Sequence, residues 1–495
     1  MSDSNQPAAE TEVNLSNEYD VRVQKYRNIL ERDGVVYKDK FDRTHTIAEA
    51  RMLVDGGSAR LCGRIISMRW FGKLLFAHIY DAGGEIQFSI SKADLPEESF
   101  EFLKTNIDMG DYIGIAGTIY HTKKGELTLQ ASEYVILSKA LRPLPEKYHG
   151  ITDTDKKFRQ RYLDVITSDE ARNTMKARIK TLRYIRNYLD AAGFCEVETP
   201  ILQNIASGAA ARPFVTKHNA LDAEFFLRIS PELFLKQVIA CGLDKVFELG
   251  RNFRNEGMDA MHLQEFTMLE WYAAYWDYKD NIKFIVKMMQ DLVMEVCGNL
   301  QIVYEGTPLD FSAFHEVDYI AEINKAVSTD ILSYDSADSL KNHIVSAGLY
   351  NAKEIEELKS IPAVVDFIFK RKLRPNIIQP TVVTNYPAFL IPLARRSDKD
   401  PRVIDMFQVI VYGAEVVKAY SELVNPLLQR ETFEEQAQNK TAGDDEAFEV
   451  DESFLLAMEH GMPPMSGLGF GIDRFLSIIT NQPTLRDVIL FPQMK

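Results

Sequence analysis

The sequence predicts an α+β protein with two folded domains, a small β-barrel followed by a larger domain that mixes strands and helices. Five short strand patterns lie between residues 59 and 138, separated by turn-forming residues. A segment rich in proline and charge, residues 139–168, follows them. A long helical pattern from Ser168 to Ala192 then opens the mixed region. A chain of 495 residues has the length of two or three domains.

Residues 1–58 are predicted to form a disordered N-terminus and a helical extension. Residues 1–14 are polar and small, which is typical of a disordered segment. Residues 16–33 place apolar side chains among charged ones, which predicts an amphipathic helix that ends at Gly34.

Residues 59–138 are predicted to form the barrel. Asp81–Gly84 and Lys123–Gly125 supply turns, and Leu95–Met109 predicts a helix between the third and fourth strands. Five strands with this interruption match an OB-type barrel, and a generic small β-barrel is the alternative. The predicted strands are Arg60–Arg69, Leu74–Tyr80, Ile86–Ser91, Tyr112–His121 and Leu127–Leu137.

Charge and composition limit the class of protein. The formal net charge of −15 argues against broad, non-specific binding of nucleic acids. Residues 139–161 differ, with seven lysines and arginines against three acids, so contacts with a polyanion are expected there and on individually placed side chains.

We expect a cytoplasmic protein without membrane contacts. No apolar run approaches the roughly 20 residues that span a bilayer. The polar, acidic N-terminus is not typical of a signal peptide. The cysteines lie far apart without Cys-x-x-Cys spacing, so neither a zinc site nor a disulfide framework is indicated.

A predicted hairpin carries the most informative chemistry. The apolar strand pattern Val246–Leu249 leads to Arg254, and a polar loop with Glu256 and His262 leads into a second strand. The hairpin tip therefore offers an arginine, an acid and a histidine to one ligand. An ordinary hairpin with a surface ion pair is the alternative.

The second strand of this hairpin predicts a pocket for a cationic group. Alternate residues of a strand share one face. Glu270 and Tyr272 therefore place a carboxylate and a phenol side by side, among aromatic side chains. The residues on this face are Phe266, Met268, Glu270 and Tyr272.

Two further stretches flank the hairpin in the sequence. Gly193–Pro200 follows the long helical pattern as a helix end and a strand. The run Gly467–Gly471 is rich in glycine, and Arg474 opens an apolar helix after it, about 220 residues beyond Arg254. Glycine permits close approach of the backbone to a ligand. The sequence has no P-loop pattern, so a P-loop ATPase is not expected.

Together these stretches resemble motifs 1, 2 and 3 of the class II aminoacyl-tRNA synthetases, in the lysyl-tRNA synthetase version. The resemblance covers the chain from about residue 17 to residue 495. It implies an OB-fold anticodon-binding domain at 59–138, a linker at 139–168 and a catalytic domain at 169–495 built on an antiparallel sheet. It also implies lysine, ATP and tRNA(Lys) as substrates, Mg²⁺ as cofactor, and a homodimer with Gly193–Pro200 in its interface.

The resemblance assigns an ATP site. Lysine carboxylate and ATP are both anionic, so their reaction needs positive charge that is already in place. Arg254 matches the arginine that holds the α-phosphate and the amino acid carboxylate, and Arg474 matches the one that binds the γ-phosphate. Both are the expected catalytic residues. The other expected ATP-binding residues are Glu256, His262, Phe266, Glu415 and Gly471.

The resemblance also assigns a lysine site. Glu232 and the Gly208 backbone match groups that meet the substrate α-amine, and Glu270 and Glu422 match groups around the ε-ammonium. A buried ammonium is costly without acceptors, so clustered carboxylates are what such a pocket requires. The expected lysine-binding residues are Gly208, Glu232, Arg254, Glu270, Tyr272, Lys418, Tyr420 and Glu422.

Three positions depart from the family pattern. The family usually has an acid in place of Gln408, an asparagine in place of Lys418 and an arginine in place of Ala414. Magnesium is expected at Glu415 and Gln408, a site with one negative charge fewer than usual. The hypothesis is that the Lys418 ammonium replaces one magnesium ion or neutralises the lysine carboxylate, and a solvated Lys418 is the alternative.

The barrel is expected to read the anticodon. OB barrels bind single strands by stacking bases on aromatic side chains and by reading base edges with polar groups. A lone phenylalanine on a strand is otherwise a core residue. The residues that match the family's anticodon contacts are Arg69, Phe76, Gln87 and Glu126.

The expected activity is the formation of lysyl-adenylate from lysine and ATP, followed by esterification of tRNA(Lys) at the 3′-hydroxyl. One alternative is a paralogue that lysylates a translation-factor protein, although such paralogues lack the anticodon barrel. Another alternative is a catalytically inactive RNA-binding or regulatory protein. Gln408 and Lys418 support this alternative, whereas Arg254 and Arg474 argue against it.

Overall fold

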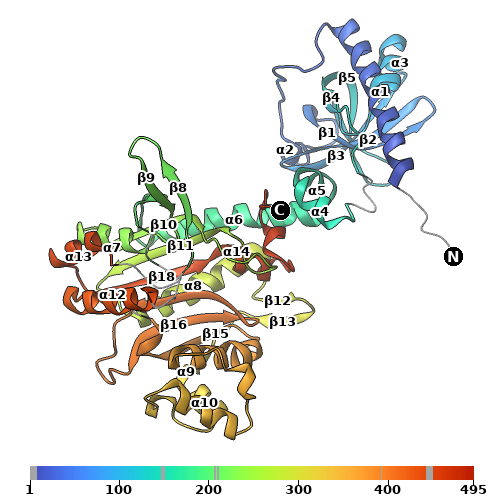
Figure 1. The fold of residues 1–495 in the computed structure, drawn as a ribbon. Coiled ribbons are helices and arrows are strands. Elements are labelled where there is room, and N and C mark those ends of the chain that lie inside the picture. The colour runs from blue at the N-terminus through green and yellow to red at the C-terminus, as the bar shows by residue number, and fades with distance from the viewer. Residues whose placement is uncertain are drawn as a thin grey trace. The chain divides into compact units, whose positions relative to one another are not determined.

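The structure of the chain is a computed structural model that describes residues 8–145, 151–205, 208, 211–391, 393–441 and 450–494. The chain divides into two units, Met1–Ser168 and Asp169–Lys495, and each is treated by itself (Figure 1). No helix in the described ranges is both long and apolar enough to cross a membrane.

The first unit contains the predicted barrel. Its elements are β1 (Ser58–Phe71), β2 (Leu74–Asp81), β3 (Gly84–Ser91), α3 (Glu97–Asn106), β4 (Tyr112–His121), β5 (Leu127–Ser138) and the short α2 (Ile47–Ala50). The strands close in the order β1-β2-β3-β5-β4, with β3 and β5 parallel and the other pairs antiparallel. The helix lies in sequence between the third and fourth strands, as predicted. Leu75 and Ala77 belong to the apolar core, so alternation turns Phe76 and His78 outward.

The N-terminal helix α1 (Ala8–Asp33) is longer than predicted. It begins within residues 1–14, which were expected to be disordered, and residues 1–7 lie outside the described part. Alanine and glutamate at positions 8–12 are strong helix formers, which explains the extension. The predicted end at Gly34 is confirmed, since this glycine takes a positive φ of 70°.

The segment predicted as a linker, residues 139–168, is structured at both ends. Lys139 is buried, and its Nζ lies 2.8 Å from Asp111 Oδ2 and also contacts Asp108, which ties the start of the segment to the barrel. Two short helices, α4 (Thr154–Arg159) and α5 (Arg161–Thr167), form its end. Residues 146–150, including Lys147 of the basic segment, lie outside the described part.

The second unit is built on an eight-stranded sheet. Its strands are β6 (Cys195–Glu196), β10 (Lys245–Phe253), β11 (Glu265–Ala274), β14 (His315–Asp318), β15 (Thr381–Pro387), β16 (Val403–Val411), β17 (Ala414–Ser421) and β18 (Met465–Gly471). The order is β14-β15-β16-β17-β18-β11-β10-β6, with an antiparallel interior and a parallel strand at each edge. The expected antiparallel sheet is confirmed.

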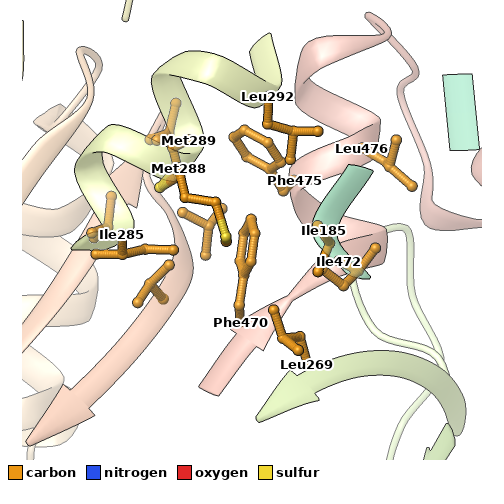
Figure 2. Close-up of a cluster of buried hydrophobic side chains, with 14 of the residues drawn as sticks. Ile185, Leu269, Ile285, Met288, Met289, Leu292, Phe470, Ile472, Phe475 and Leu476 are labelled. Atoms are coloured by element: carbon orange, nitrogen blue, oxygen red, sulfur yellow. The ribbon is translucent and has the colours of Figure 1, made fainter. Parts of the chain in front are cut away.

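One face of this sheet is covered by α6 (Asp169–Ala191), α8 (Tyr278–Cys297) and α14 (Ile472–Ile479). Figure 2 shows Phe470 of β18 lying among apolar side chains of these helices, including Met288 and Phe475. Full burial of one such side chain is worth about 1.5–3 kcal/mol. This cluster fixes the position of β18 and therefore of its glycines.

A second apolar cluster lies on the opposite face, because alternate residues of β16 such as Met406 join it while Phe407 joins the first. The helices and strands of the remaining structure are α7 (Glu232–Ala240), α9 (Tyr319–Val327), α10 (Ala337–Ser346), α11 (Ile361–Ile368), α12 (Pro426–Thr441), α13 (Glu452–Glu459), β7 (Leu202–Gln203), β8 (Phe214–His218), β9 (Ala223–Leu227), β12 (Gln301–Tyr304) and β13 (Thr307–Asp310).

Candidate active site

A cavity of about 340 Å³ lies on the sheet face opposite the core of Figure 2. It brings together every residue that was predicted to bind ATP or lysine. Those residues are Gly208, Glu232, Arg254, Glu256, His262, Phe266, Glu270, Tyr272, Glu415, Lys418, Tyr420, Glu422, Gly471 and Arg474.

The hairpin of β10 and β11 positions one wall. The two strands pair without interruption from Lys245 with Ala273 to Phe253 with Glu265. Phe266, Met268, Glu270 and Tyr272 all line the cavity, so the predicted strand alternation is confirmed. In the connecting loop His262 Nδ1 lies 2.9 Å from Asp259 Oδ2.

Glycines of β18 allow two side chains to meet in the cavity. A Cβ at Gly467 would lie 2.2 Å from the Tyr272 ring and 2.4 Å from Glu422 Oε1, which are clashes. Gly467 therefore shapes the acidic end. Of this glycine run only Gly471 is predicted to approach the nucleotide, and the sequence does not reveal that Gly467 pairs with Tyr272 across β18 and β11.

The acidic end holds three buried carboxylates, those of Glu232, Glu270 and Glu422. The Ser230 hydroxyl donates to Glu270 Oε1 at 2.9 Å, and the Tyr420 hydroxyl donates to Glu232 Oε1 at 2.7 Å. Burial, reinforced by the neighbouring Glu232, raises the pKa of Glu270 to about 8 and that of Glu422 to about 8. The arrangement suits a ligand that brings positive charge.

Sequence reasoning missed one cation of this end, Lys236. Its side chain is 1% exposed, and its Nζ lies 2.8 Å from Glu232 Oε1 and 2.5 Å from Glu422 Oε2. Burial opposes the charge, but Glu232 and Glu422 outweigh it and raise the pKa of Lys236. The available signal was the i,i+4 spacing from Glu232 on an apolar helix.

The other end of the cavity is cationic. The Arg254 guanidinium lies over the Phe266 ring, 5.1 Å from its centroid. Arg474 Nη1 donates to the backbone oxygen of Glu415 at 2.5 Å. The preceding Asp473 accepts from Arg178 Nη1 at 2.5 Å and from the Thr267 backbone N–H at 2.7 Å, which anchors the start of α14. Two arginines held in this way can bind phosphate oxygens.

A β-bulge turns Glu415 into the cavity. The pairing of β16 with β17 shifts by one residue between Val409 and Ile410, which places Glu415 on the face that carries Gln408 and Lys418. Lys418 lines the cavity on this same face, and the role of its ammonium stays a prediction.

Gln408 makes two hydrogen bonds inside the protein. Its Nε2 donates to Glu415 Oε2 at 2.6 Å, and its Oε1 accepts from the Tyr386 hydroxyl at 2.7 Å. Within the described residues no cluster of three or more histidines, cysteines or acids could hold a metal. Glu415 supplies one carboxylate at the cationic end, and Mg²⁺ is commonly held by one or two carboxylates together with phosphate oxygens of a substrate.

The barrel presents its four predicted residues beside one another. Arg69 pairs with Phe76 across β1 and β2, and Gln87 of β3 pairs with His78 of β2. His78 Nε2 lies 2.9 Å from Glu126 Oε1. Phe76 is partly exposed and is no member of the barrel core, so the alternative of a core phenylalanine is wrong. His78 was missed, because nothing in the sequence marks it.

Comparisons with known proteins agree with this geometry. A family model described as tRNA synthetases class II (D, K and N) matches residues 153–495, and one described as OB-fold nucleic acid binding domain matches residues 59–137. The lysine–tRNA ligases of Escherichia coli O157:H7 and K12 are each 41% identical to this chain, covering 100% of it and 99% of their own length. That of Pelotomaculum thermopropionicum is 41% identical over 96% of this chain and 94% of its own. The chain therefore belongs to the class II tRNA synthetases, in the lysine–tRNA ligase family.

Proposed function

We propose that this lysine–tRNA ligase uses the cavity of the second unit to join L-lysine to ATP as lysyl-adenylate, and then transfers the lysyl group to tRNA(Lys). The observation that carries the proposal is the polarity of one cavity. Its acidic end, with Glu232, Glu270 and Glu422, suits two ammonium groups, and its cationic end, with Arg254 and Arg474, suits phosphate and carboxylate oxygens.

Lysine lies in this proposal with both ammonium groups toward the acids. Glu232 and the Gly208 backbone receive the α-ammonium, and Glu270, Tyr272 and Glu422 receive the ε-ammonium. A desolvated ammonium needs paired acceptors, and the three carboxylates supply them. Tyr420 packs on the substrate chain and holds Glu232 by its hydroxyl.

The chemical step needs orientation and positive charge, without a covalent enzyme nucleophile. The lysine carboxylate attacks the α-phosphorus in line, and pyrophosphate leaves. Arg254 stabilises the charge on the α-phosphate, and Arg474 binds the γ-phosphate. Glu256, His262, Phe266 and Gly471 hold the remainder of the nucleotide.

Magnesium is proposed as the cofactor. Glu415 would hold it together with phosphate oxygens, with Gln408 taking part only through its hydrogen bond to Glu415. A bound magnesium ion neutralises charge on the triphosphate. We propose that the Lys418 ammonium supplies positive charge that the family obtains from a further ion, because Lys418 faces the same cavity.

Transfer of the lysyl group is proposed to depend on the barrel. Phe76 would stack on an anticodon base, with Arg69, Gln87 and Glu126 reading or holding its neighbours. The barrel also favours a tRNA over a protein as acceptor, since paralogues that lysylate a protein lack it. We further propose a cytoplasmic homodimer with Gly193–Pro200 in its interface, which light scattering of the purified protein would test.

Lysine-dependent exchange of pyrophosphate into ATP tests the activation step. Exchange should require lysine, proceed without tRNA, and stay at background with methionine or glutamate. An enzyme that exchanges equally with these amino acids would show that the acidic end does not select the substrate.

A further inference from the structure

Lys236 is a buried cation for which the reaction proposed above has no use. It lies on α7 one turn after Glu232 and bridges Glu232 to Glu422, at 2.8 and 2.5 Å. Its ammonium is shielded from solvent, because the side chain is only 1% exposed. Three aromatic rings enclose it, those of Tyr272, Tyr420 and Phe454 at 5.8, 5.8 and 5.9 Å.

The charges of this end can be counted. Glu232, Glu270 and Glu422 are 7%, 5% and 2% exposed, and together would carry three negative charges. Lys236 supplies one positive charge, which leaves two negative charges unpaired. The lysine substrate carries two ammonium groups. In addition, Glu422 shares the Lys236 ammonium with Glu232, so one cation serves two of the three carboxylates.

We propose that Lys236 is an internal counter-ion that sets the unpaired charge of the pocket at two and aligns Glu232 and Glu422 for a substrate with two ammonium groups. The inference rests on the proposed assignment of these acids to lysine. Lys236 is a positioning residue, because it acts through Glu232 and Glu422.

The physical reason is repulsion between desolvated acids. Two buried carboxylates that share no cation avoid each other or bind a proton. Even with Lys236 in place, burial and Glu232 raise the pKa of Glu422 to about 8. Loss of Lys236 must raise it further, so lysine would have to displace a more tightly held proton in the variant than in the wild type. The titratable and charged groups around this cluster are Glu232 on α7, Arg228 and Arg254 near β10, Glu270 and Tyr272 on β11, and Tyr420 and Glu422 on and beside β17.

The test compares Lys236→Met with the wild type by pyrophosphate exchange between pH 6.5 and 9.5. Methionine keeps the length and removes the charge. The KM for lysine should rise at least about tenfold at pH 7, and the ratio of mutant to wild-type KM should stay level below about pH 8, where Glu422 is protonated in both enzymes, and fall toward about tenfold per pH unit above it. The KM for ATP and kcat at saturating lysine should change little. A ratio that stays constant up to pH 9.5 would mean that Lys236 only fills space.

Lys245→Met is the matched control. Lys245 lies over the rings of Phe194 and Trp276 at 5.5 and 5.0 Å, in the same unit but outside the cavity. Its removal should leave the KM for lysine at the wild-type value at every pH.

Chemical rescue gives a second readout. Lys236→Ala removes the equivalent of n-propylammonium, so added n-propylammonium should lower the KM for lysine in this variant and only compete with lysine in the wild type. Absence of rescue in a folded variant contradicts the proposal. If neither variant folds, inhibition of the wild-type enzyme still tests the proposal. Cadaverine, which has two ammonium groups, should inhibit at least about tenfold better than pentylamine, which has one. Equal inhibition by the two amines would overturn the charge count.

Glu422→Gln separates this inference from the assignment beneath it. Wild-type kinetics in Glu422→Gln would show that the acids do not bind lysine. If Glu422→Gln loses activity with lysine while Lys236→Met keeps the wild-type KM for lysine at every pH, the counter-ion role of Lys236 is refuted and the assignment of the acids to lysine stands.

Discussion

At the scale of single residues, three carboxylates in one desolvated pocket destabilise one another unless cations pair them. The pKa of Glu270 and that of Glu422 both rise to about 8 in the empty pocket, because burial and Glu232 disfavour their charged forms. Ionising these groups therefore costs folding stability as pH rises from their ordinary pKa toward 8. In the proposed complex a bound lysine would supply the missing cations, which matches a pocket that favours ligand binding over stability.

Glu422→Gln should cripple lysine activation in a folded protein. The change leaves a substrate ammonium without its charged partner in a desolvated site, which costs about 2–5 kcal/mol, or roughly 30-fold to several thousand-fold in kcat/KM for lysine. Pyrophosphate exchange measures the loss, and circular dichroism checks the fold. Glu265→Gln, at the exposed start of β11, is the control and should keep wild-type activity. Full activity in Glu422→Gln would refute the pocket assignment.

Lys418→Asn should raise the magnesium requirement. If the Lys418 ammonium supplies charge in place of a second ion, exchange by the wild type saturates when magnesium is near the ATP concentration. The variant should then need an excess, and addition of Gln408→Glu should restore activity at high magnesium. Titration of exchange against magnesium at fixed ATP measures this, and an unchanged curve for Lys418→Asn would sink the idea.

At the scale of elements, β18 joins the apolar core to the site. Phe470 packs into the core of Figure 2 while Gly467 and Gly469 face the cavity. One face of the strand is therefore held by packing in the core, and the glycines on the other face leave room for the cavity. This explains why a glycine-rich strand lies in the interior of the sheet, where glycine otherwise weakens pairing.

Gly467→Ala should damage the lysine site more than the ATP site. The new methyl group would lie 2.2 Å from the Tyr272 ring and must displace it or Glu422. The KM for lysine should rise by at least about tenfold, in line with an overpacking cost of about 1–3 kcal/mol, with a smaller change for ATP. Gly469→Ala is the matched comparison, since its Cβ would meet nothing closer than 3.7 Å. Equal effects of the two changes on lysine KM would contradict the steric account.

Strand periodicity explains how much of this could be predicted from the sequence. Alternation alone placed Phe266, Glu270 and Tyr272 on one face, and the family resemblance supplied their roles. The bulge that turns Glu415 inward and the Lys236 bridge could not be found in this way. The bulge interrupts the register within the hairpin of β16 and β17, where strict alternation gives the wrong face, and the bridge from Lys236 to Glu422 joins segments far apart in the chain. The helix start at Ala8 was missed for the opposite reason, because polar composition was given more weight than helix propensity.

At the scale of the whole molecule, the two units are proposed to carry separate recognition tasks. The cavity lies in the second unit and the proposed anticodon surface in the first. Lysine activation should therefore be separable from tRNA recognition by mutation.

Phe76→Ala should weaken aminoacylation of tRNA(Lys) and leave pyrophosphate exchange nearly intact. Loss of one base stack costs about 1–3 kcal/mol, or roughly 5- to 150-fold in kcat/KM for tRNA. Phe88→Ala is the contrast, because its fully buried ring belongs to the barrel core and its loss should lower the melting temperature. Equal damage by Phe76→Ala to exchange and to aminoacylation would show that Phe76 serves the fold.

Transfer of labelled lysine to purified tRNA(Lys) tests the central claim most directly. The purified protein with ATP, magnesium and lysine should charge tRNA(Lys) to a stable plateau through a base-labile ester at the terminal 3′-hydroxyl, release AMP and pyrophosphate, and fail to charge a tRNA with an unrelated anticodon. Failure to charge tRNA(Lys) despite lysine-dependent exchange, or transfer of the label to protein in its place, would contradict the account.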